Sequence, residues 1–75
     1  MKIRLTNEII FKLQHPNYAK VKKGLTEVLN LDRTSIVRLL KENQVNGHLT
    51  KLAVIEYLET ELNVARHQLI EIIED

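Results

Sequence analysis

The chain of 75 residues contains no cysteine. This absence excludes disulfide bonds, thiolate metal sites and cysteine nucleophiles, and it fits a reducing, intracellular setting. Proline, glycine and aromatic residues are also few, whereas hydrophobic residues make up 44% of the chain and charged residues 28%. This is the composition of a globular protein. We therefore expect a single folded domain over residues 1–75, stabilised by packing alone.

Long apolar runs are missing as well. No stretch approaches the ~20 apolar residues that a membrane-spanning helix needs. The charged start, Met1-Lys2-Ile3-Arg4, is not followed by the apolar segment of a signal peptide. The sequence predicts a cytoplasmic protein without a membrane partner.

Residues that carry catalysis or bind metals are sparse. Ser35 is the only serine, and it has no histidine nearby in sequence, so a small residue near a helix start is the stronger interpretation. His15, His48 and His67 stand singly, without the ligand spacing typical of zinc sites. The two glycines lie far apart and form no phosphate-binding loop. We expect no enzyme, no metal, no cofactor and no small-molecule substrate.

Charge is distributed unevenly along the chain. Residues 1–41 hold nine basic and three acidic side chains, which gives a net charge of +6. Residues 42–75 hold two basic and seven acidic side chains, a net charge of −5. A domain polarised in this way can present one face to a polyanion while another face is repelled from it. The alternative is a chance clustering of solvated surface charge.

Helix signals dominate, and strand-like alternation appears only in the first five residues. The first helix is expected to begin at Thr6 or Asn7 and to end near Gln14, because Pro16 disfavours helical geometry in the residue before it. Pro16 suits the first turn of a second helix, which Asn30 can end because asparagine tolerates a positive φ. We therefore expect a compact, all-α domain of four to five helices.

The later helices have similar signals. Asp32 is a good N-cap for a third helix, which is followed by a polar loop at residues 42–48. Thr50 can cap a fourth helix that ends at Asn63, and a last helix is expected over 65–73. The spacing of apolar residues predicts the buried positions of the first four helices: Ile9, Ile10 and Leu13; Tyr18, Val21, Leu25, Val28 and Leu29; Ile36, Leu39 and Leu40; Leu52, Ala53, Ile55, Leu58 and Leu62. In the last helix Leu69, Ile72 and Ile73 share one side, whereas Ile70 points toward the flank.

The second and third helices, with a tight turn between them, match the spacing of a helix-turn-helix. Leu25 and Leu29 can pack against Leu31 in the turn and against Ile36 and Leu39 of the following helix. These leucines and isoleucine belong to the core under any interpretation. The helix at about residues 33–42 then acts as the recognition helix.

The outward residues of this helix have the chemistry that reads DNA. Arginine and lysine donate to guanine or to phosphates, threonine reaches a base edge, and valine can contact a thymine methyl. The base-reading candidates are Arg33, Thr34, Val37, Arg38 and Lys41, and the phosphate-contacting candidates on the preceding helix are Lys20, Lys22 and Lys23. A merely solvated basic face is the alternative interpretation of the same residues.

Residues 20–64 resemble the lambda-repressor/Cro-like helix-turn-helix domain of phage and plasmid regulators. The stretch LTEVLNLDRTSIVRLL at residues 25–40 is similar to the family's turn and capped second helix, and residues 49–53 resemble the start of its fourth helix. Asn30 stands where the family usually has glycine, and Thr26 where it usually has alanine. The resemblance implies that the helix at 33–42 enters the major groove and that the protein acts as a dimer.

Two function classes follow. The favoured one is sequence-specific binding of double-stranded DNA by a small transcriptional regulator of phage or mobile-element type. The alternative is a small helical protein–protein interaction module that does not bind DNA, suggested by the apolar residues Ile9, Ile10 and Phe11 and by the apolar end of the chain. Both allow a homodimer, for which the expected last helix is the candidate contact.

Overall fold

A computed structural model describes residues 1–74, and Asp75, the last residue of the expected domain, lies outside this range. Helices dominate, as expected, and they are accompanied by a small two-stranded sheet that was not expected. The order is β1 (Lys2–Leu5), α1 (Asn7–Gln14), η1 (Pro16–Tyr18), α2 (Ala19–Leu29), α3 (Arg33–Glu42), η2 (His48–Thr50), α4 (Leu52–Leu62), α5 (Arg66–Leu69) and β2 (Ile70–Ile73), where η marks a 3-10 helix.

The first helix forms where its capping residues predict it. The Thr6 hydroxyl accepts a hydrogen bond from the Ile9 N–H at 3.3 Å, which satisfies one of the free donors at the start of α1. Before Pro16, His15 adopts an extended conformation with a ψ of 139°, and α1 ends at Gln14. Both expected boundaries of this helix are confirmed.

Asparagine ends three of the helices. Asn30 after α2, Asn43 after α3 and Asn63 after α4 have φ values of 54°, 42° and 52°, in the left-handed region that glycine more often occupies. The roles of Asn30 and Asn63 are confirmed, whereas that of Asn43 was not expected. The second helix begins later than expected, since Pro16 opens a 3-10 turn and α2 itself begins at Ala19.

The start of α4 differs from the expectation. Thr50 is not its cap: Lys51 occupies the N-cap position without a side-chain bond, and the Thr50 hydroxyl donates to the Gly47 carbonyl at 2.7 Å. Leu52 and Ala53 are exposed, and Val54 joins Ile55 in the core instead. Val54 and Leu58 are four residues apart and share one face of the helix, whereas Leu52 lies roughly 200° around the axis from Val54.

The expected last helix stops at Leu69. From Ile70 onward the chain forms β2, which pairs antiparallel with β1, with Leu5 opposite Ile70 and Lys2 opposite Ile73. The segment is rich in β-branched isoleucine, which favours strands, and β1 offers it a backbone partner. Ile72 and Ile73 therefore do not form the apolar helix face that we expected them to share with Leu69, and Ile72 is 59% exposed.

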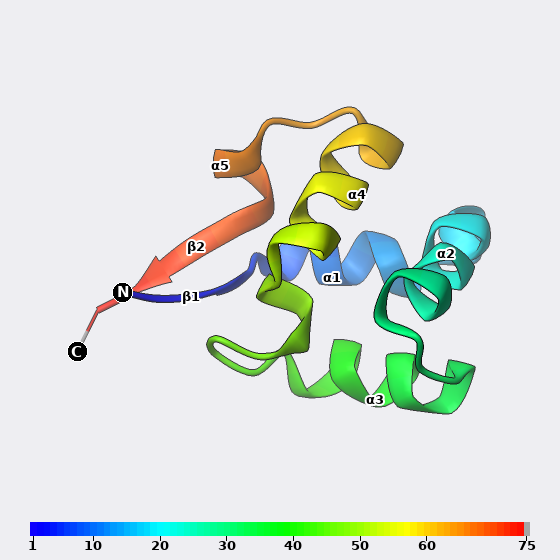
Figure 1. The fold of residues 1–75 in the computed structure, drawn as a ribbon. Helices are drawn as coiled ribbons and strands as arrows, with labels where there is room; N and C mark the ends of the chain where they lie inside the picture. The colour runs from blue at the N-terminus through cyan, green and yellow to red at the C-terminus, as the bar shows by residue number, and fades with distance from the viewer. Residues whose placement is uncertain (75) are drawn as a thin grey trace.

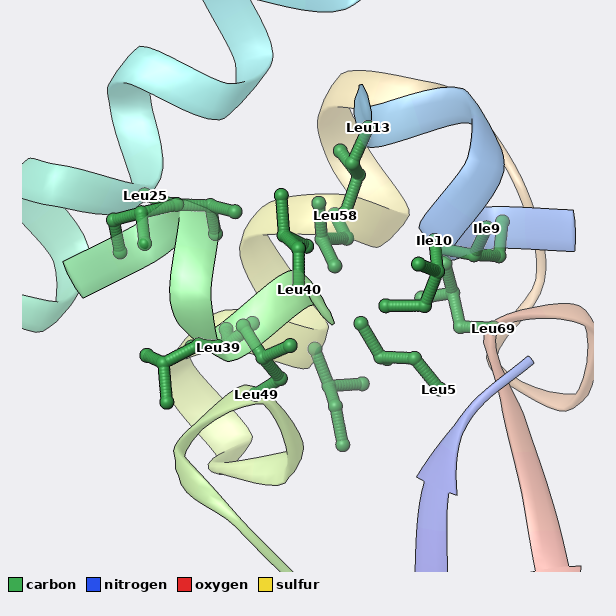
Figure 2. Packing of buried hydrophobic residues seen from close by; sticks show 13 residues of the cluster. Leu5, Ile9, Ile10, Leu13, Leu25, Leu39, Leu40, Leu49, Leu58 and Leu69 are labelled. Atoms are coloured by element: carbon green, nitrogen blue, oxygen red, sulfur yellow. The ribbon is translucent and has the colours of Figure 1, made fainter. Parts of the chain in front are cut away.

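One hydrophobic cluster joins the helices to the base of the ribbon that β1 and β2 form. Leu5 and Leu69 are fully buried in it, although the ribbon itself projects from the helices (Figure 1). Figure 2 shows Leu40 of α3 pointing toward the centre of this cluster. Its buried members are Leu5, Ile9, Ile10, Leu13, Leu25, Ile36, Leu39, Leu40, Leu49, Val54, Ile55, Leu58 and Leu69.

A glycine lets α4 approach α2 closely. The Tyr57 hydroxyl of α4 donates to the Val21 carbonyl of α2 at 2.9 Å. A Cβ atom at Gly24 would lie 1.8 Å from the Tyr57 Oη, so no larger residue fits without displacing the ring. Burial, aided by the negative charges of Glu61 and Glu27, raises the pKa of Tyr57, so its hydroxyl keeps the proton that it donates. This contact holds α2 in place behind α3.

Among residues 1–74, no helix is both long and apolar enough to cross a lipid bilayer.

Candidate nucleic-acid interface

The expected two-helix unit consists of α2, a three-residue connection and α3. Asn30 turns the chain, and the Leu31 N–H donates to the Thr26 carbonyl at 3.1 Å, which directs Leu31 back onto the core. The Asp32 carboxylate then accepts from the Ser35 N–H at 2.8 Å and caps α3. These local bonds determine where α3 begins relative to α2.

The inward and outward faces of α3 are as predicted. Ile36, Leu39 and Leu40 are buried in the hydrophobic cluster. Every base-reading candidate is exposed to solvent: Arg33, Thr34, Val37, Arg38 and Lys41. Because these residues follow one another at intervals of three and four, they share one side of the helix. The structure therefore brings all five together on a single exposed face, which we call the α3 face.

Two acidic residues border the α3 face, and their electrostatic effect was not foreseen. The Arg38 guanidinium lies 3.9 Å from the Glu42 carboxylate, one helical turn later, yet the Arg38 side chain remains 70% exposed. An exposed pair of this kind contributes little, so Arg38 is free to exchange Glu42 for another acceptor. The i, i+4 spacing of the two residues is the sequence signal for this pair.

Asp32 lies at the other end of α3. Its hydrogen bonds with Ser35, and to a smaller extent the positive charge of Arg38, lower the pKa of the Asp32 carboxyl below its usual value of 3.8. Asp32 therefore carries its negative charge throughout the neutral pH range. The carboxylate sits beside the cations of the α3 face and reduces their net charge.

The lysines of α2 divide into two groups. Lys22 and Lys23 line a surface depression of about 480 Å³ between α2 and the start of α3. The opposite wall includes Leu31, Arg33 and Ile36, so the floor is apolar and the rim carries three cations. Lys20 is not among the lining residues, and it lies on the flank of this side of α2, roughly 110° from its centre. The structure thus brings two of the three phosphate candidates next to Arg33.

The depression was not predicted, although its α2 wall has a sequence signal. Ala19, Lys22, Lys23 and Thr26 follow one another at helical spacing and so share one side of α2. The position of that side against α3 depends on how the two helices pack. Local sequence patterns do not specify how the two helices pack.

Most acidic residues of the second half lie on elements other than α3, although Glu42 is its last residue. In Figure 1, α3 runs along one side of the domain, whereas α5 and β2 lie on the opposite side. Acidic residues of the second half are therefore distributed over α4 and the terminal ribbon. The ribbon also carries Lys2 and Arg4 of the basic half, so the division of charge along the chain is preserved only in part in the fold.

The three histidines lie on separate elements. His15 accepts a hydrogen bond from the Asn17 N–H through Nδ1 at 3.2 Å, and its ring lies 6.5 Å from that of Phe11. His48 begins η2, and His67 lies in α5. Within residues 1–74, no three His, Asp or Glu side chains are grouped in a way that could hold a metal ion.

Comparisons of the chain with family models, with curated proteins and with solved structures found no match.

Proposed function

We propose that the protein binds double-stranded DNA in a sequence-specific manner and acts as a small transcriptional regulator of phage or mobile-element type. In this proposal α2 and α3 form a helix-turn-helix of the lambda-repressor/Cro-like kind, and α3 lies in the major groove. The observation that carries it is the α3 face, on which three cations, one hydroxyl and one apolar side chain are exposed together over a buried base.

Each residue of the α3 face has a role in this proposal. Arg38 and Lys41 donate to guanine O6 and N7, Thr34 donates to a base edge or a phosphate, and Val37 contacts a thymine methyl. Arg33 lies at the rim of the depression with Lys22 and Lys23, where it can bind either a base or the phosphate backbone.

The conformation of Asn30 supports the same proposal. The residue has a φ of 54° and so adopts the left-handed geometry for which the resembling family usually has glycine. The side chain of Thr26, another departure from the family, donates to the Lys23 carbonyl at 2.6 Å and stays within its own helix. Neither departure obstructs the connection between α2 and α3.

The first test is a selection of binding sites from random DNA duplexes, followed by titration of the selected site. We expect Arg38→Ala to weaken binding to that site by about 1–3 kcal/mol, while thermal unfolding is unchanged. Arg38→Lys is the matched control, since it keeps the charge but loses the two-pronged contact with guanine. If both variants bind as tightly as the parent, Arg38 does not read a base.

Salt dependence provides the second test. Lys22→Ala and Lys23→Ala should each reduce the slope of log K against log salt by about one unit on any DNA sequence. Lys20→Ala removes the same charge from a residue of α2 that does not line the depression, so we expect a smaller change from it. Equal slopes in all four proteins would exclude α2 from the contact with the DNA backbone.

The alternative function, a protein-interaction module without DNA binding, is supported by Phe11, which is 69% exposed on α1. Apolar association through such a residue strengthens or stays constant as salt rises, whereas phosphate binding weakens steeply. Association with a protein partner that persists at high salt and is lost in Phe11→Ala would favour this alternative.

A further inference from the structure

The two edges of the β1–β2 ribbon differ in how their backbone groups are satisfied. On the outer edge of β1, the Ile3 N–H donates to the Asn46 Oδ1 at 2.9 Å, and the Ile3 carbonyl accepts from the Asn46 N–H at 2.7 Å. The Asn43 side-chain amide donates to the Leu5 carbonyl at 2.9 Å. The loop after α3 therefore covers this edge much as a third strand would.

The outer edge of β2 has no such cover within residues 1–74. Ile3 bonds away from β2, so Ile72, which stands opposite Ile3, belongs to a pair without mutual hydrogen bonds. The N–H and the carbonyl of Ile72 consequently point away from β1. The Ile70 carbonyl points the same way, whereas the Ile70 N–H donates to the Arg66 carbonyl.

The side chains beside this edge are mostly apolar. Ile72 is 59% exposed, and together with Ile70, Arg66 and His67 it lines a surface depression of about 570 Å³. Natural edge strands are usually protected from association by lysine, proline, a bulge or a covering segment. Residues 70–73 contain neither lysine nor proline, and their one charge, Glu71, is engaged by Arg4 at 2.6 Å.

We propose that the edge of β2 pairs antiparallel with β2 of a second copy of this chain, which makes one continuous sheet of four strands across a two-fold axis. A second copy fits because an antiparallel edge is complementary to itself, so each partner offers the donors and acceptors that the other lacks. This inference does not depend on DNA binding.

The hydrogen bonds favour a register centred on Ile72 over one centred on Glu71. With Ile72 opposite Ile72 of the second copy, each supplies one N–H and one carbonyl, and each Ile70 carbonyl accepts from Glu74 of the other copy. A register centred on Glu71 would use fewer bonds, because the Ile70 N–H is already occupied by Arg66. It would also place the two Glu71 carboxylates opposite each other.

The side chains that border the depression are compatible with the same register. Glu74 of the second copy then lies opposite Ile70, on the side where Arg66 and His67 border the depression. Arg66 is already paired with Glu59 at 3.0 Å, so Glu74 of the second copy would approach an existing ion pair, and the arrangement repeats on the other side of the two-fold axis. Ile72 of each copy covers Ile72 of the other. Because the contact is confined to short strands, its area is below that of a standard interface and association should be weak.

Sedimentation equilibrium of the full chain tests the assembly. We expect monomer and dimer to exchange over concentrations of about 10–500 µM, as suits a small interface. Ile72→Pro should weaken association about tenfold or more, because proline removes an N–H that points away from β1 and spares the bonds between β1 and β2. Ile72→Lys should act similarly, since it opposes two like charges across the axis.

Leu52→Lys is the matched control. Leu52 is also 59% exposed, but it lies at the start of α4, outside the ribbon. We expect this variant to associate like the parent. A parent that stays monomeric throughout, Ile72 variants that associate like the parent, or an equal loss in Leu52→Lys would each overturn the proposal.

Amide hydrogen exchange of the parent protein gives a second readout that needs no variant. The amides of Glu71 and Ile73 face β1 and should be protected at every concentration. Those of Ile72 and Glu74 should exchange rapidly at low concentration and become protected as the concentration rises. Exchange of Ile72 that is independent of concentration would show that β2 is not the contact. DNA binding is measured in separate experiments, so the failure of one proposal does not affect the other.

Discussion

The α2–α3 unit and the β1–β2 ribbon are anchored in the same hydrophobic cluster, but different interactions build them. In the α2–α3 unit the specific contacts are local, such as the bond between Asp32 and the Ser35 N–H three residues later. In the ribbon they join the two ends of the chain, as in the pair Arg4–Glu71 at a separation of 67 residues. Closing so long a loop costs conformational entropy that only a folded core offsets.

This difference affects what each region leaves exposed. The local unit can form its own boundaries and still leave one side of α3 exposed, because its core side chains come from the opposite side. The ribbon depends on the rest of the domain, yet it leaves a backbone edge exposed. Each region thus exposes groups that can bind a partner. The α2–α3 unit exposes cationic side chains, and the ribbon exposes backbone N–H and carbonyl groups.

The largest effects should come from the residues that anchor both regions. Leu5 at the base of the ribbon and Leu25 in α2 are both fully buried. Truncation of either to alanine should reduce the free energy of unfolding by about 2–5 kcal/mol, which urea titration followed by circular dichroism would measure. Ile72→Ala, at the exposed part of the ribbon, should cost less than about 0.5 kcal/mol.

This comparison can fail in an informative way. If Leu5→Ala costs no more than Ile72→Ala, the ribbon is not part of the cooperative core and can open while the helices remain folded.

A smaller effect is expected where α4 approaches α2. In Gly24→Ala the new Cβ meets the Tyr57 ring, and overpacking of this kind costs about 1–3 kcal/mol. In a Tyr57→Ala background the same change should become neutral or stabilising, because alanine favours a helix over glycine by about 1 kcal/mol. The four proteins form a double-mutant cycle, measured by thermal unfolding. Additive effects would mean that the two residues do not meet.

The ion pair across the ribbon should contribute less again. The Arg4 and Glu71 side chains are 38% and 36% exposed, so solvent screens their attraction and Arg4→Ala should cost about 0.2–1 kcal/mol. The effect should decrease in high salt. Arg66→Ala, which removes a pair with Glu59 that is local in sequence, is the control for loss of an arginine. A charge exchange, Arg4→Glu with Glu71→Arg, should recover the stability lost in either single variant.

The sequence predicted most of the α2–α3 unit because its determinants are close together in the chain. Pro16, Asn30 and Asp32 act on backbone groups a few residues away, and the spacing of Ile36 and Leu39 sets the buried side of α3. The orientation of the five outward residues follows from the same spacing. The depression lined by Lys22, and the position of Lys20 outside it, depend on how α2 packs against α3. Local patterns do not specify this packing.

The end of the chain was mispredicted because competing local signals are nearly balanced there. Residues 69–73 are apolar enough for either a helix or a strand, and the partner that decides the outcome is β1, at the other end of the sequence. The alternation of Ile3 and Leu5 with charged residues indicated a strand, but a single strand does not predict a sheet until its partner strand is known. Thr50 failed as a cap because it ends η2 and α4 begins only at Leu52, with Lys51 at the N-cap position.

The smallest expected effect concerns Asp32, which both caps α3 and adds a negative charge beside the α3 face. Hydrogen bonds with Ser35 lower the pKa of Asp32 in the folded protein. The stabilisation from its ionised form is therefore complete above the unfolded pKa, near 3.8, and is lost as the pH falls through the lower folded value. Asp32→Asn retains a good cap without a titrating group.

We therefore expect the difference in melting temperature between the parent and Asp32→Asn to shift against the parent as the pH falls below about 4, and to be constant between pH 5 and 7. Other carboxyl groups titrate in both proteins, so the difference isolates Asp32. At neutral pH the variant also removes one negative charge beside Arg33 and Arg38, which should strengthen binding to any DNA sequence slightly. A difference in melting temperature that is the same at every pH would mean that the ionised carboxylate contributes nothing to the start of α3.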